Sequence, residues 1–325
     1  MIPEVERIAD DIRTMRIRGA ARIARTAAEA LRIVAERSEA KDLDGFMREL
    51  NQAAHLLLST RPTAVSLPNA VNYVLSRVRR AAESGSLREV KWETIRAAND
   101  FIDSSLRALD IIGELGARRI KHGDVVMTHC NSSAAISVIL KAAEQGKVEE
   151  VYATETRPRF QGRLTARQLA EKGVKVNLIV DSAARYFMNE VDRVVVGADA
   201  VAVNGAVVNK VGTSMIALAA HEARVRFYVA AETYKLSPST ILGELIEIEE
   251  RPATEVVEEE FLRKYPSIRV RNPAFDITPP EYIDLIITNK GVYPPQAIAM
   301  LMREEFEWIL EELYPEYRVR LVEEE

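Results

Sequence analysis

Hydrophobic and polar positions follow one pattern over the first third of the chain. From residue 4 to about 116, apolar residues recur at spacings of three and four, and Ala, Leu, Arg and Glu dominate. This spacing places the apolar residues on one face of a helix, and the dominant residues are good helix formers. Turn and cap residues interrupt the pattern at 41–45, 59–62 and 84–86. We therefore predict an all-helical domain over residues 1–118.

A second pattern begins at residue 119, where short apolar runs alternate with helical stretches. The runs lie at 125–127, 148–153, 176–180, 194–196, 227–230 and 283–288. Helices are predicted to begin near Ser132, Leu164, Ala183 and Ser214. Apolar strands separated by helices are typical of a parallel sheet that is covered on both faces. We predict an α/β chain in which a doubly wound, Rossmann-like domain with a mostly parallel sheet, residues 119–325, follows the helical one. Residues 236–282 fit this pattern poorly and are predicted to be excursions around the sheet.

Composition excludes several classes of protein. Hydrophobic residues make up 47% and charged residues 29%, the balance of a globular protein. The net charge of −5, from 44 basic and 49 acidic residues, argues against a general nucleic-acid binder. No run approaches the roughly 18 apolar residues of a membrane span, and the start lacks a signal segment. We expect a soluble, cytoplasmic protein that binds neither nucleic acid nor membranes.

Cysteine, histidine and glycine motifs limit the chemistry further. Cys130 is the one cysteine, so an internal disulfide or a cysteine-cluster zinc site is excluded, and the four histidines are scattered. The chain lacks GxGxxG after a strand, GxxxxGK[ST] and GxSxG. We therefore expect no metal and no nucleotide cofactor, and ligands are expected at the carboxyl ends of the strands.

The first polar junction, residues 128–133, follows the run 125–127 and opens a helix. Cys130 there is a candidate thiolate, because the positive end of a helix dipole lowers a thiol pKa. Backbone amides and the hydroxyls of Ser132 and Ser133 suit a phosphate. A buried structural cysteine with two capping serines is the alternative.

The second junction, residues 155–165, contains three arginines, Arg157, Arg159 and Arg163, in a connection shaped by Gly and Pro. Guanidinium groups bind phosphate in bidentate fashion, so an anionic ligand is one interpretation. Solvated loop arginines that pair with nearby glutamates are the other.

Two further junctions add a carboxylate and cations. Asp199 ends the run 194–196 and is either a general acid or base, a hydroxyl acceptor or a structural cap. Asn204-Gly205 predicts a hairpin, and Asn209 and Lys210 come just before a helix start. Lys235 supplies another cation after the run 227–230.

A glycine beside cations, Arg18-Gly19, interrupts the first helical stretch. Glycine there lets the backbone approach a ligand closely, and a corner between helices with solvated arginines is the alternative.

Taken in order, five motifs resemble one known family. They are Arg18-Gly19-Ala20, Thr128-His129-Cys130, ETRPxxQGRLT at 155–165, GAD at 197–199 and NGAVVNKVGT at 204–213. The family is that of the aldose phosphate isomerases related to translation initiation factor 2B, and the resemblance extends to Asn289–Pro295. The family includes methylthioribose-1-phosphate isomerases, archaeal ribose-1,5-bisphosphate isomerases and the non-catalytic α, β and δ subunits of the initiation factor. The stretches at 155–174, 180–188, 230–238 and 272–295 are most similar to the ribose-1,5-bisphosphate branch.

The resemblance implies conversion of ribose 1,5-bisphosphate to ribulose 1,5-bisphosphate in AMP metabolism, with catalytic roles for Cys130 and Asp199. Asp199 is expected to protonate the ring oxygen and a Cys130 thiolate to take the carbon-2 proton, with a hydride shift as the alternative. The implied substrate contacts are Arg18, Gly19, Arg61, Ser132, Ser133, Arg157, Gln161, Arg163, Asn209, Lys210 and Lys235. Many relatives are expected to have a basic residue at the place of Ser133.

The resemblance also implies assembly from dimers into a homohexamer, with AMP as a candidate activator. Two other functions stay open: a methylthioribose-1-phosphate isomerase, and a regulatory subunit of the initiation-factor type. A thiol and a carboxylate together favour catalysis over a regulatory subunit. The cations Arg18, Arg61, Arg157, Arg163 and Lys235 favour a substrate with two phosphates.

Overall fold

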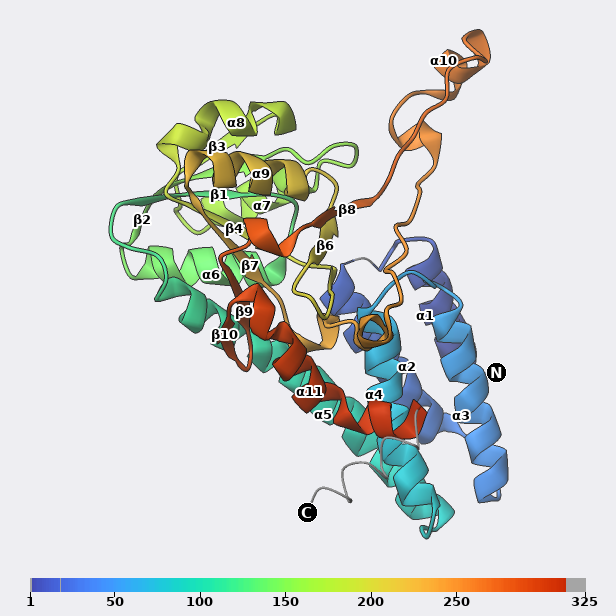
Figure 1. Ribbon diagram of the computed structural model, residues 1–325. Coiled ribbons are helices and arrows are strands. Elements are labelled where there is room, and N and C mark those ends of the chain that lie inside the picture. The colour runs from blue at the N-terminus through green and yellow to red at the C-terminus, as the bar shows by residue number, and fades with distance from the viewer. Residues whose placement is uncertain (1, 18, 314–325) are drawn as a thin grey trace. The chain divides into compact units, whose positions relative to one another are not determined.

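The computed structural model describes residues 2–17 and 19–313, with side chains to residue 306 (Figure 1). Its contacts divide the chain into two compact units, one up to Asp110 and the other from Ile111. The predicted change of pattern near residue 118 comes directly after the helix α5, Leu87–Ala117. Arg18 lies outside the described residues.

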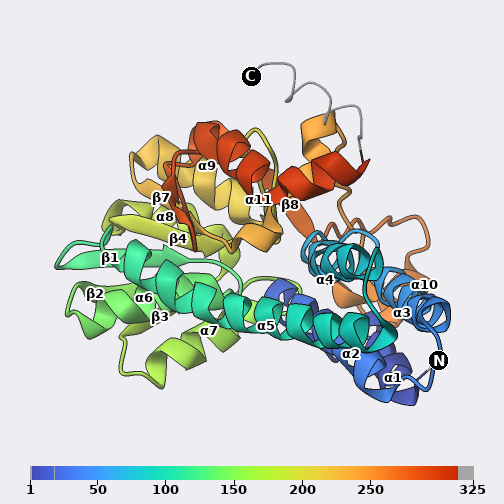
Figure 2. The same cartoon turned by 90° about the horizontal axis from the view of Figure 1, so that it is seen from below.

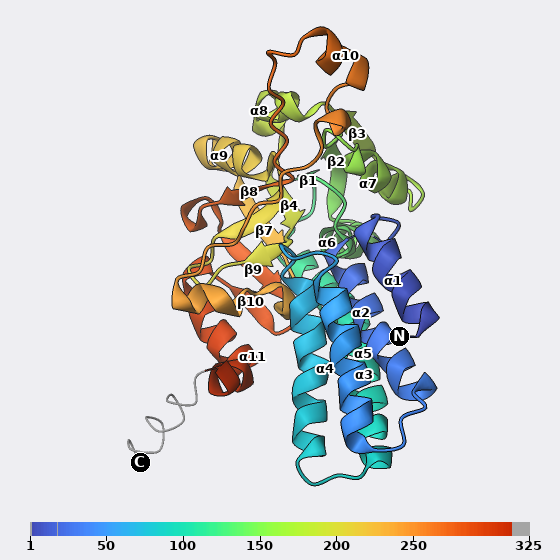
Figure 3. The same cartoon turned by 90° about the vertical axis from the view of Figure 1, so that its right-hand side faces the viewer.

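The first unit is helical, as predicted. Its elements are α1 Pro3–Arg13, α2 Ala20–Arg37, α3 Leu43–Leu58, α4 Ser66–Ala82 and the first part of α5. Figure 3 shows α2, α3 and α4 lying alongside one another, and each buries one apolar face, with Leu31, Leu50 and Val71 fully buried. The interruption at 41–45 acts as expected, because the Asp42 carboxylate accepts a hydrogen bond from the Gly45 N–H at 2.6 Å and caps α3.

Two predicted substrate contacts belong to this helical unit. Gly19 is the exposed N-cap of α2, with a φ of 90° that favours glycine. Arg61 follows α3, and its Nη1 lies 2.7 Å from the Met15 sulfur.

The second unit contains the predicted sheet. Seven strands lie in the order β10-β9-β7-β4-β1-β2-β3, and all neighbours are parallel except the β10–β9 pair. The strands are β1 Asp124–Thr128, β2 Val148–Thr154, β3 Val176–Ile179, β4 Arg193–Gly197, β7 Arg226–Ala230, β9 Leu285–Thr288 and β10 Gly291–Tyr293. The α/β architecture expected from the apolar runs is confirmed.

Helices cover both faces of this sheet. They are α6 Ser133–Glu144, α7 Gln161–Ala170, α8 Ala184–Phe187 and α9 Thr213–Ala223. Helix α6 packs against α7, and α8 against α9, and Figure 2 shows the two pairs on opposite sides of the strands. This follows from right-handed crossovers, because the chain moves from β1 to β3 in one direction and from β4 to β9 in the other. The direction reverses beside β1, where doubly wound sheets bind ligands at the carboxyl ends of their strands.

A small antiparallel sheet stands beside the large one. It pairs β5 Ala200–Val201 with β6 Val207–Lys210, and β6 with β8 Phe275–Thr278. The predicted Asn204-Gly205 hairpin joins β5 to β6, and Gly205 has a φ of 81°. Strand β8 was not predicted, because it lies inside the irregular stretch 236–282. Much of that stretch forms the arm around α10, Glu259–Lys264, in Figure 1.

Helix α11, Ile298–Leu313, follows β10. Within the described residues, no helix combines the length and the apolar character that a membrane crossing requires.

Candidate active site

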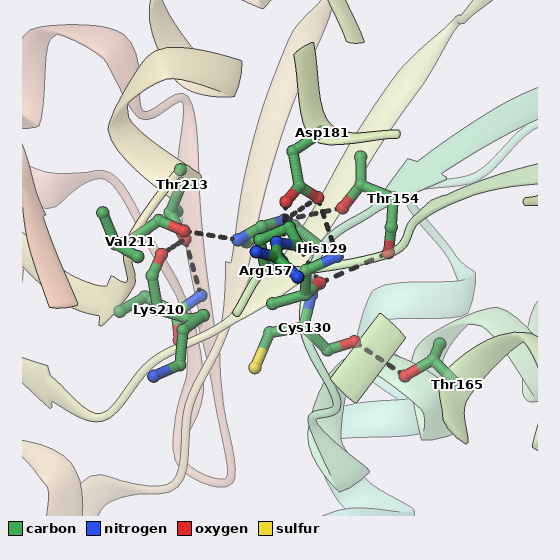
Figure 4. A network of polar contacts seen from close by, with 12 residues as sticks. His129, Cys130, Thr154, Arg157, Thr165, Asp181, Lys210, Val211 and Thr213 are labelled. Atoms are coloured by element: carbon green, nitrogen blue, oxygen red, sulfur yellow. Dashed lines mark hydrogen bonds and ion pairs between the residues drawn. The ribbon is translucent and has the colours of Figure 1, made fainter. Parts of the chain in front are cut away.

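The loop after β1 presents Cys130 in a left-handed conformation. Its φ is 68°, which is uncommon for a residue with a side chain. Its N–H donates to the Thr156 hydroxyl at 2.9 Å, and its carbonyl accepts from the Thr165 hydroxyl at 2.7 Å (Figure 4). Loops that follow β1 and β2 therefore fix the cysteine together, and strained backbone held in this way is typical of functional sites.

Ser132 and Gly197 bring the end of β4 to the same place. Ser132 caps α6 by accepting from the Ala135 N–H at 3.3 Å, as the predicted helix start implies. A Cβ at Gly197 would lie 2.2 Å from the Ser132 hydroxyl oxygen, so only glycine lets the two loops approach this closely. Asp199 follows two residues later, and its N–H donates to the Val208 carbonyl at 2.9 Å. Ser133 opens α6 and is exposed.

The protonation state of Cys130 differs from the expectation. Burial raises the pKa of the Cys130 thiol to about 11, while the Lys210 ammonium lowers it and the charges of Asp199 and Asp181 raise it. The predicted lowering of the pKa by the helix dipole is wrong, because desolvation of the thiolate has the larger effect. The free protein thus has a protonated thiol, and Lys210 and the two carboxylates lie close enough to influence it.

His129 lies between the loops with its side chain fully buried. Its Nε2 is 2.9 Å from the Val211 carbonyl oxygen, and its Nδ1 is 2.6 Å from the Thr154 hydroxyl (Figure 4). Burial lowers the pKa of His129, so the ring is neutral. A carbonyl only accepts, so Nε2 carries the proton and Nδ1 accepts from Thr154.

Asp181, just after β3, organises the arginine-rich loop. Its two carboxylate oxygens accept from the N–H groups of Thr156 and Arg157, each at 2.7 Å. These contacts hold Thr156 at a φ of 63°, a genuine outlier for a β-branched residue. The loop is therefore fixed before any ligand arrives.

The arginines of this loop were predicted either to bind an anion or to pair with nearby glutamates, and the structure differs from one arginine to the next. Arg159 pairs with Glu255 at 3.0 Å and Arg163 with Glu155 at 3.0 Å, as in the interpretation of solvated loop arginines. Arg163 also stacks over the Phe160 ring at 3.8 Å, and Arg157 lies 5.1 Å from the same ring. Arg157 is exposed and donates a long bond of 3.5 Å to the Val256 carbonyl.

Gln161 and Gly162 begin α7 beside this loop. The Gln161 Oε1 atom is buried and accepts no hydrogen bond from the part of the chain that the structure describes. A Cβ at Gly162 would lie 1.7 Å from the Thr154 carbonyl oxygen, so the close packing of α7 on the end of β2 requires glycine. An acceptor such as the Gln161 oxygen suits a hydroxyl group of a ligand.

Lys210 and Asn209 end β6 in different surroundings. The Lys210 ammonium donates to the Ala274 carbonyl at 2.8 Å and projects to the same side as the Cys130 sulfur in Figure 4. Asn209 is buried, and its amide donates to the Thr213 hydroxyl at 3.0 Å. Its position supports the turn before α9.

Asp276 on β8 holds that turn from the other side. Its carboxylate accepts from the Gly212 N–H at 2.7 Å and from the Ser214 N–H at 3.1 Å. Burial raises the pKa of Asp276 to about 6, against the lowering by these N–H groups and by Lys210.

Lys235 is not a free cation. Its ammonium lies 2.7 Å from the Glu232 carboxylate, and the two side chains are only 6% and 1% exposed. The Lys235 charge contributes to a lowered pKa of Glu232 despite the burial of that carboxylate. The pair is typical of a buried structural ion pair.

Sequence reasoning did not single out four residues that shape this site, namely His129, Thr156, Asp181 and Asp276. Asp181 could have been predicted as a site residue, because a carboxylate directly after an apolar run lies where a parallel strand ends. His129 directly precedes Cys130, the candidate thiolate. Nothing in the sequence indicated Asp276 as a site residue, since its strand β8 was not predicted.

Comparison with known proteins gives consistent similarities. The model of the initiation factor 2 subunit family matches residues 16–295. Ribose 1,5-bisphosphate isomerase of Thermococcus kodakarensis is 54% identical over 317 residues, 97% of this chain and 98% of that protein. The enzyme of that name from Archaeoglobus fulgidus is 57% identical over 301 residues, 93% of each chain. The crystal structure of 5-methylthioribose 1-phosphate isomerase from Pyrococcus horikoshii OT3 matches with a TM-score of 0.75 and 33% identity, over 93% of this chain and 87% of that one.

Proposed function

The chain belongs to the initiation factor 2 subunit family, and from this premise we propose that it is an isomerase that converts ribose 1,5-bisphosphate to ribulose 1,5-bisphosphate. The observation that carries the proposal is identity of 54% and 57% with two proteins of that name over nearly the whole chain. A fold alone does not define a function, so the proposal also has to agree with the chemistry of the site.

The reaction requires an acid at the ring oxygen bonded to carbon 1 and a base at carbon 2. A proton given to the ring oxygen breaks its bond to carbon 1, and removal of the carbon-2 proton leaves an enol phosphate. Loss of the carbon-2 hydroxyl proton and delivery of a proton to carbon 1 then give the ketose. Atoms and charge balance without an oxidant. The hydrogen lost from carbon 2 is matched by the one added to carbon 1, and the proton gained by the ring oxygen is matched by the one lost from the carbon-2 hydroxyl.

Cys130 and Asp199 are the proposed acid–base pair. In the free protein Cys130 holds its proton, and the Asp199 charge contributes to that preference. Transfer of this proton to Asp199 gives a thiolate and a neutral carboxylic acid together, which are the base and the acid that the first step needs. Lys210 favours the thiolate and is therefore proposed to assist this transfer.

Phosphate binding is proposed for cations and donors around this pair. Arg157 is suited to a phosphate through its guanidinium, and the α6 N-terminus with Ser132 and Ser133 through its backbone N–H groups and hydroxyls. Gln161 is proposed to accept from a sugar hydroxyl. The contributions of Arg18, Gly19, Arg61, Arg163, Asn209 and Lys235 stay predictions from the resemblance.

Assembly and location are proposed on the same basis. Copies of the chain are proposed to form two-fold dimers that associate into a hexamer in the cytoplasm. Light scattering at micromolar concentration tests this, and a single 36.4 kDa particle would contradict it.

One assay separates the candidate functions. The purified chain is given ribose 1,5-bisphosphate and, separately, 5-methylthioribose 1-phosphate, and we expect a higher kcat/KM for the bisphosphate. A preference for the methylthio sugar would support the alternative isomerase, and no turnover of either would support a regulatory role.

Solvent deuterium in the product supports proton transfer, whereas its complete absence supports a hydride shift. Adding AMP to the assay tests AMP as a candidate activator.

A further inference from the structure

His129 links the Cys130 loop to the turn that carries Lys210. We propose that His129 is a positioning residue that fixes the Lys210 ammonium relative to the Cys130 sulfur. The link itself is a property of the folded chain, and its importance for turnover rests on the proposed function.

The first step is the contact between ring and turn. The His129 backbone continues directly into Cys130, while Nε2 lies 2.9 Å from the carbonyl oxygen of Val211, the residue after Lys210. A Cβ at Gly212 would lie 3.1 Å from the His129 ring, so the turn packs closely on the ring as well as bonding to it. The imidazole therefore blocks any shift of the turn toward the ring.

The second step is that both ends of this link are anchored. The Thr154 hydroxyl at the end of β2 bonds Nδ1 at 2.6 Å and sets the orientation of the ring. On the far side, the Val211 N–H donates to the Ala274 carbonyl at 3.2 Å, and Lys210 bonds the same carbonyl at 2.8 Å. The turn is thus held between the ring and β8, and loss of the ring contact frees one of its two sides.

The third step is that His129 acts through geometry and not through charge. The ring is neutral because burial lowers its pKa, so a neutral replacement changes no charge near Cys130. The charged groups that influence the thiol are Lys210, Asp199 and Asp181. Entry of water would lower the thiol pKa, so a raised thiol pKa in a His129 variant reports movement of these charged groups. Lys210 is the group at the start of the turn that His129 contacts.

Two amide replacements isolate the relevant nitrogen. The Gln amide nitrogen reaches the position of Nε2, so His129→Gln keeps a donor for the Val211 carbonyl. The Asn amide nitrogen reaches only the position of Nδ1, so His129→Asn loses that donor and leaves the carbonyl unsatisfied. Lys210→Met removes the cation and gives the full size of its effect.

The measurement is alkylation of Cys130 by iodoacetamide at a fixed pH below the thiol pKa. Cys130 is the one cysteine of the chain, so the signal has one source, and a neutral reagent is not steered by charge. Loss of the Lys210 cation raises the thiol pKa further and leaves less thiolate. Alkylation then slows, by roughly threefold, and the slowing is modest because the scarcer thiolate is also more nucleophilic. Local unfolding has the opposite sign, since it brings the pKa back toward that of a free thiol and speeds the reaction.

We expect His129→Asn to slow alkylation about as much as Lys210→Met does, and His129→Gln to restore the parent rate within about twofold. In the Lys210→Met background, His129→Asn should cause no further slowing. Tyr152→Phe is the control, because it removes one part-buried 2.6 Å hydrogen bond from β2, to Glu190, without changing a charge near Cys130.

Unchanged or faster alkylation in His129→Asn overturns the proposal, and so does a further slowing in the Lys210→Met background. None of these outcomes depends on isomerase turnover. If alkylation behaves as expected but no sugar is turned over, the proposed function fails and the positioning role stands.

Discussion

The Ser132 hydroxyl lies against the Cα of Gly197 so closely that a Cβ there would be 2.2 Å from Ser132 Oγ and 2.4 Å from Ser132 Cβ. This contact joins the start of α6 to the end of β4. The loop that carries Cys130, two residues before Ser132, is therefore held against the loop that carries Asp199, two residues after Gly197.

Gly197→Ala should separate these two loops. Overpacking of this kind costs about 1 to 3 kcal/mol of unfolding free energy, and the displaced acid–base pair should lower kcat by roughly tenfold or more. Ser132→Gly in the same chain removes the clashing atoms, so the double variant should regain part of both losses. Denaturant unfolding and steady-state kinetics check this, and independent, additive losses would contradict the contact.

Cys130→Ser and Asp199→Asn should each lower kcat by about 10²-fold or more, since each removes a proton-transfer group and little volume. Circular dichroism and thermal unfolding should show a retained fold. Near-normal turnover in either variant would remove that residue from the proposed mechanism.

Lys235→Met should destabilise the chain by about 3 to 5 kcal/mol, because it leaves the buried Glu232 carboxylate without its cation. Glu232→Gln in the same chain should restore most of that stability, as measured by denaturant unfolding. The KM for the bisphosphate in the double variant then tests the predicted substrate contact. An increase of about tenfold or more supports that contact, and an unchanged KM assigns Lys235 to the buried pair alone.

Asp276 should make the chain less stable as the pH rises through about 6. Its folded pKa of about 6 lies above the ordinary value of 3.8, so the folded state binds this proton more tightly than the unfolded state does. The resulting stability is present below pH 3.8 and is lost between that value and about 6, by about 2 to 3 kcal/mol.

Asp276→Asn should remove this part of the pH dependence, as denaturant unfolding at several pH values will show. Asp284→Asn is the matched control, since that carboxylate also accepts from a backbone N–H, of Phe227 at 2.8 Å. Parallel curves for the parent chain and Asp276→Asn would refute the assignment.

The sequence predicted the large elements because their signals are local. The apolar runs at 125–127 and 194–196 became β1 and β4. Asn204-Gly205 became a hairpin, because glycine readily adopts the positive φ, 81° at Gly205, that this turn uses. Strand β8 escaped because four residues pair with β6 across a long stretch of chain, and nothing near Asp276 signals that partner.

The sequence indicated where the candidate site residues lie along the chain but not how buried they are or which groups surround them. Cys130, Ser132 and Asp199 were predicted as site residues because polar residues that follow apolar strands collect at one edge of a parallel sheet. The raised thiol pKa was not foreseen, since desolvation depends on loops that come from β2 and β6. Lys235 was taken for a free cation although Glu232 stands three residues before it, a spacing that brings side chains together in a turn.

The seven-stranded sheet ends in β3 on one side and β10 on the other, and these strands have four and three residues. Edges this short offer a neighbouring chain few unpaired N–H and C=O groups. Two copies that met edge to edge would gain little from backbone pairing, so the sheet is poorly suited to grow from one molecule into the next. Contacts between copies along these two edges therefore have to be made by side chains, and single surface substitutions there should weaken them without opening the sheet.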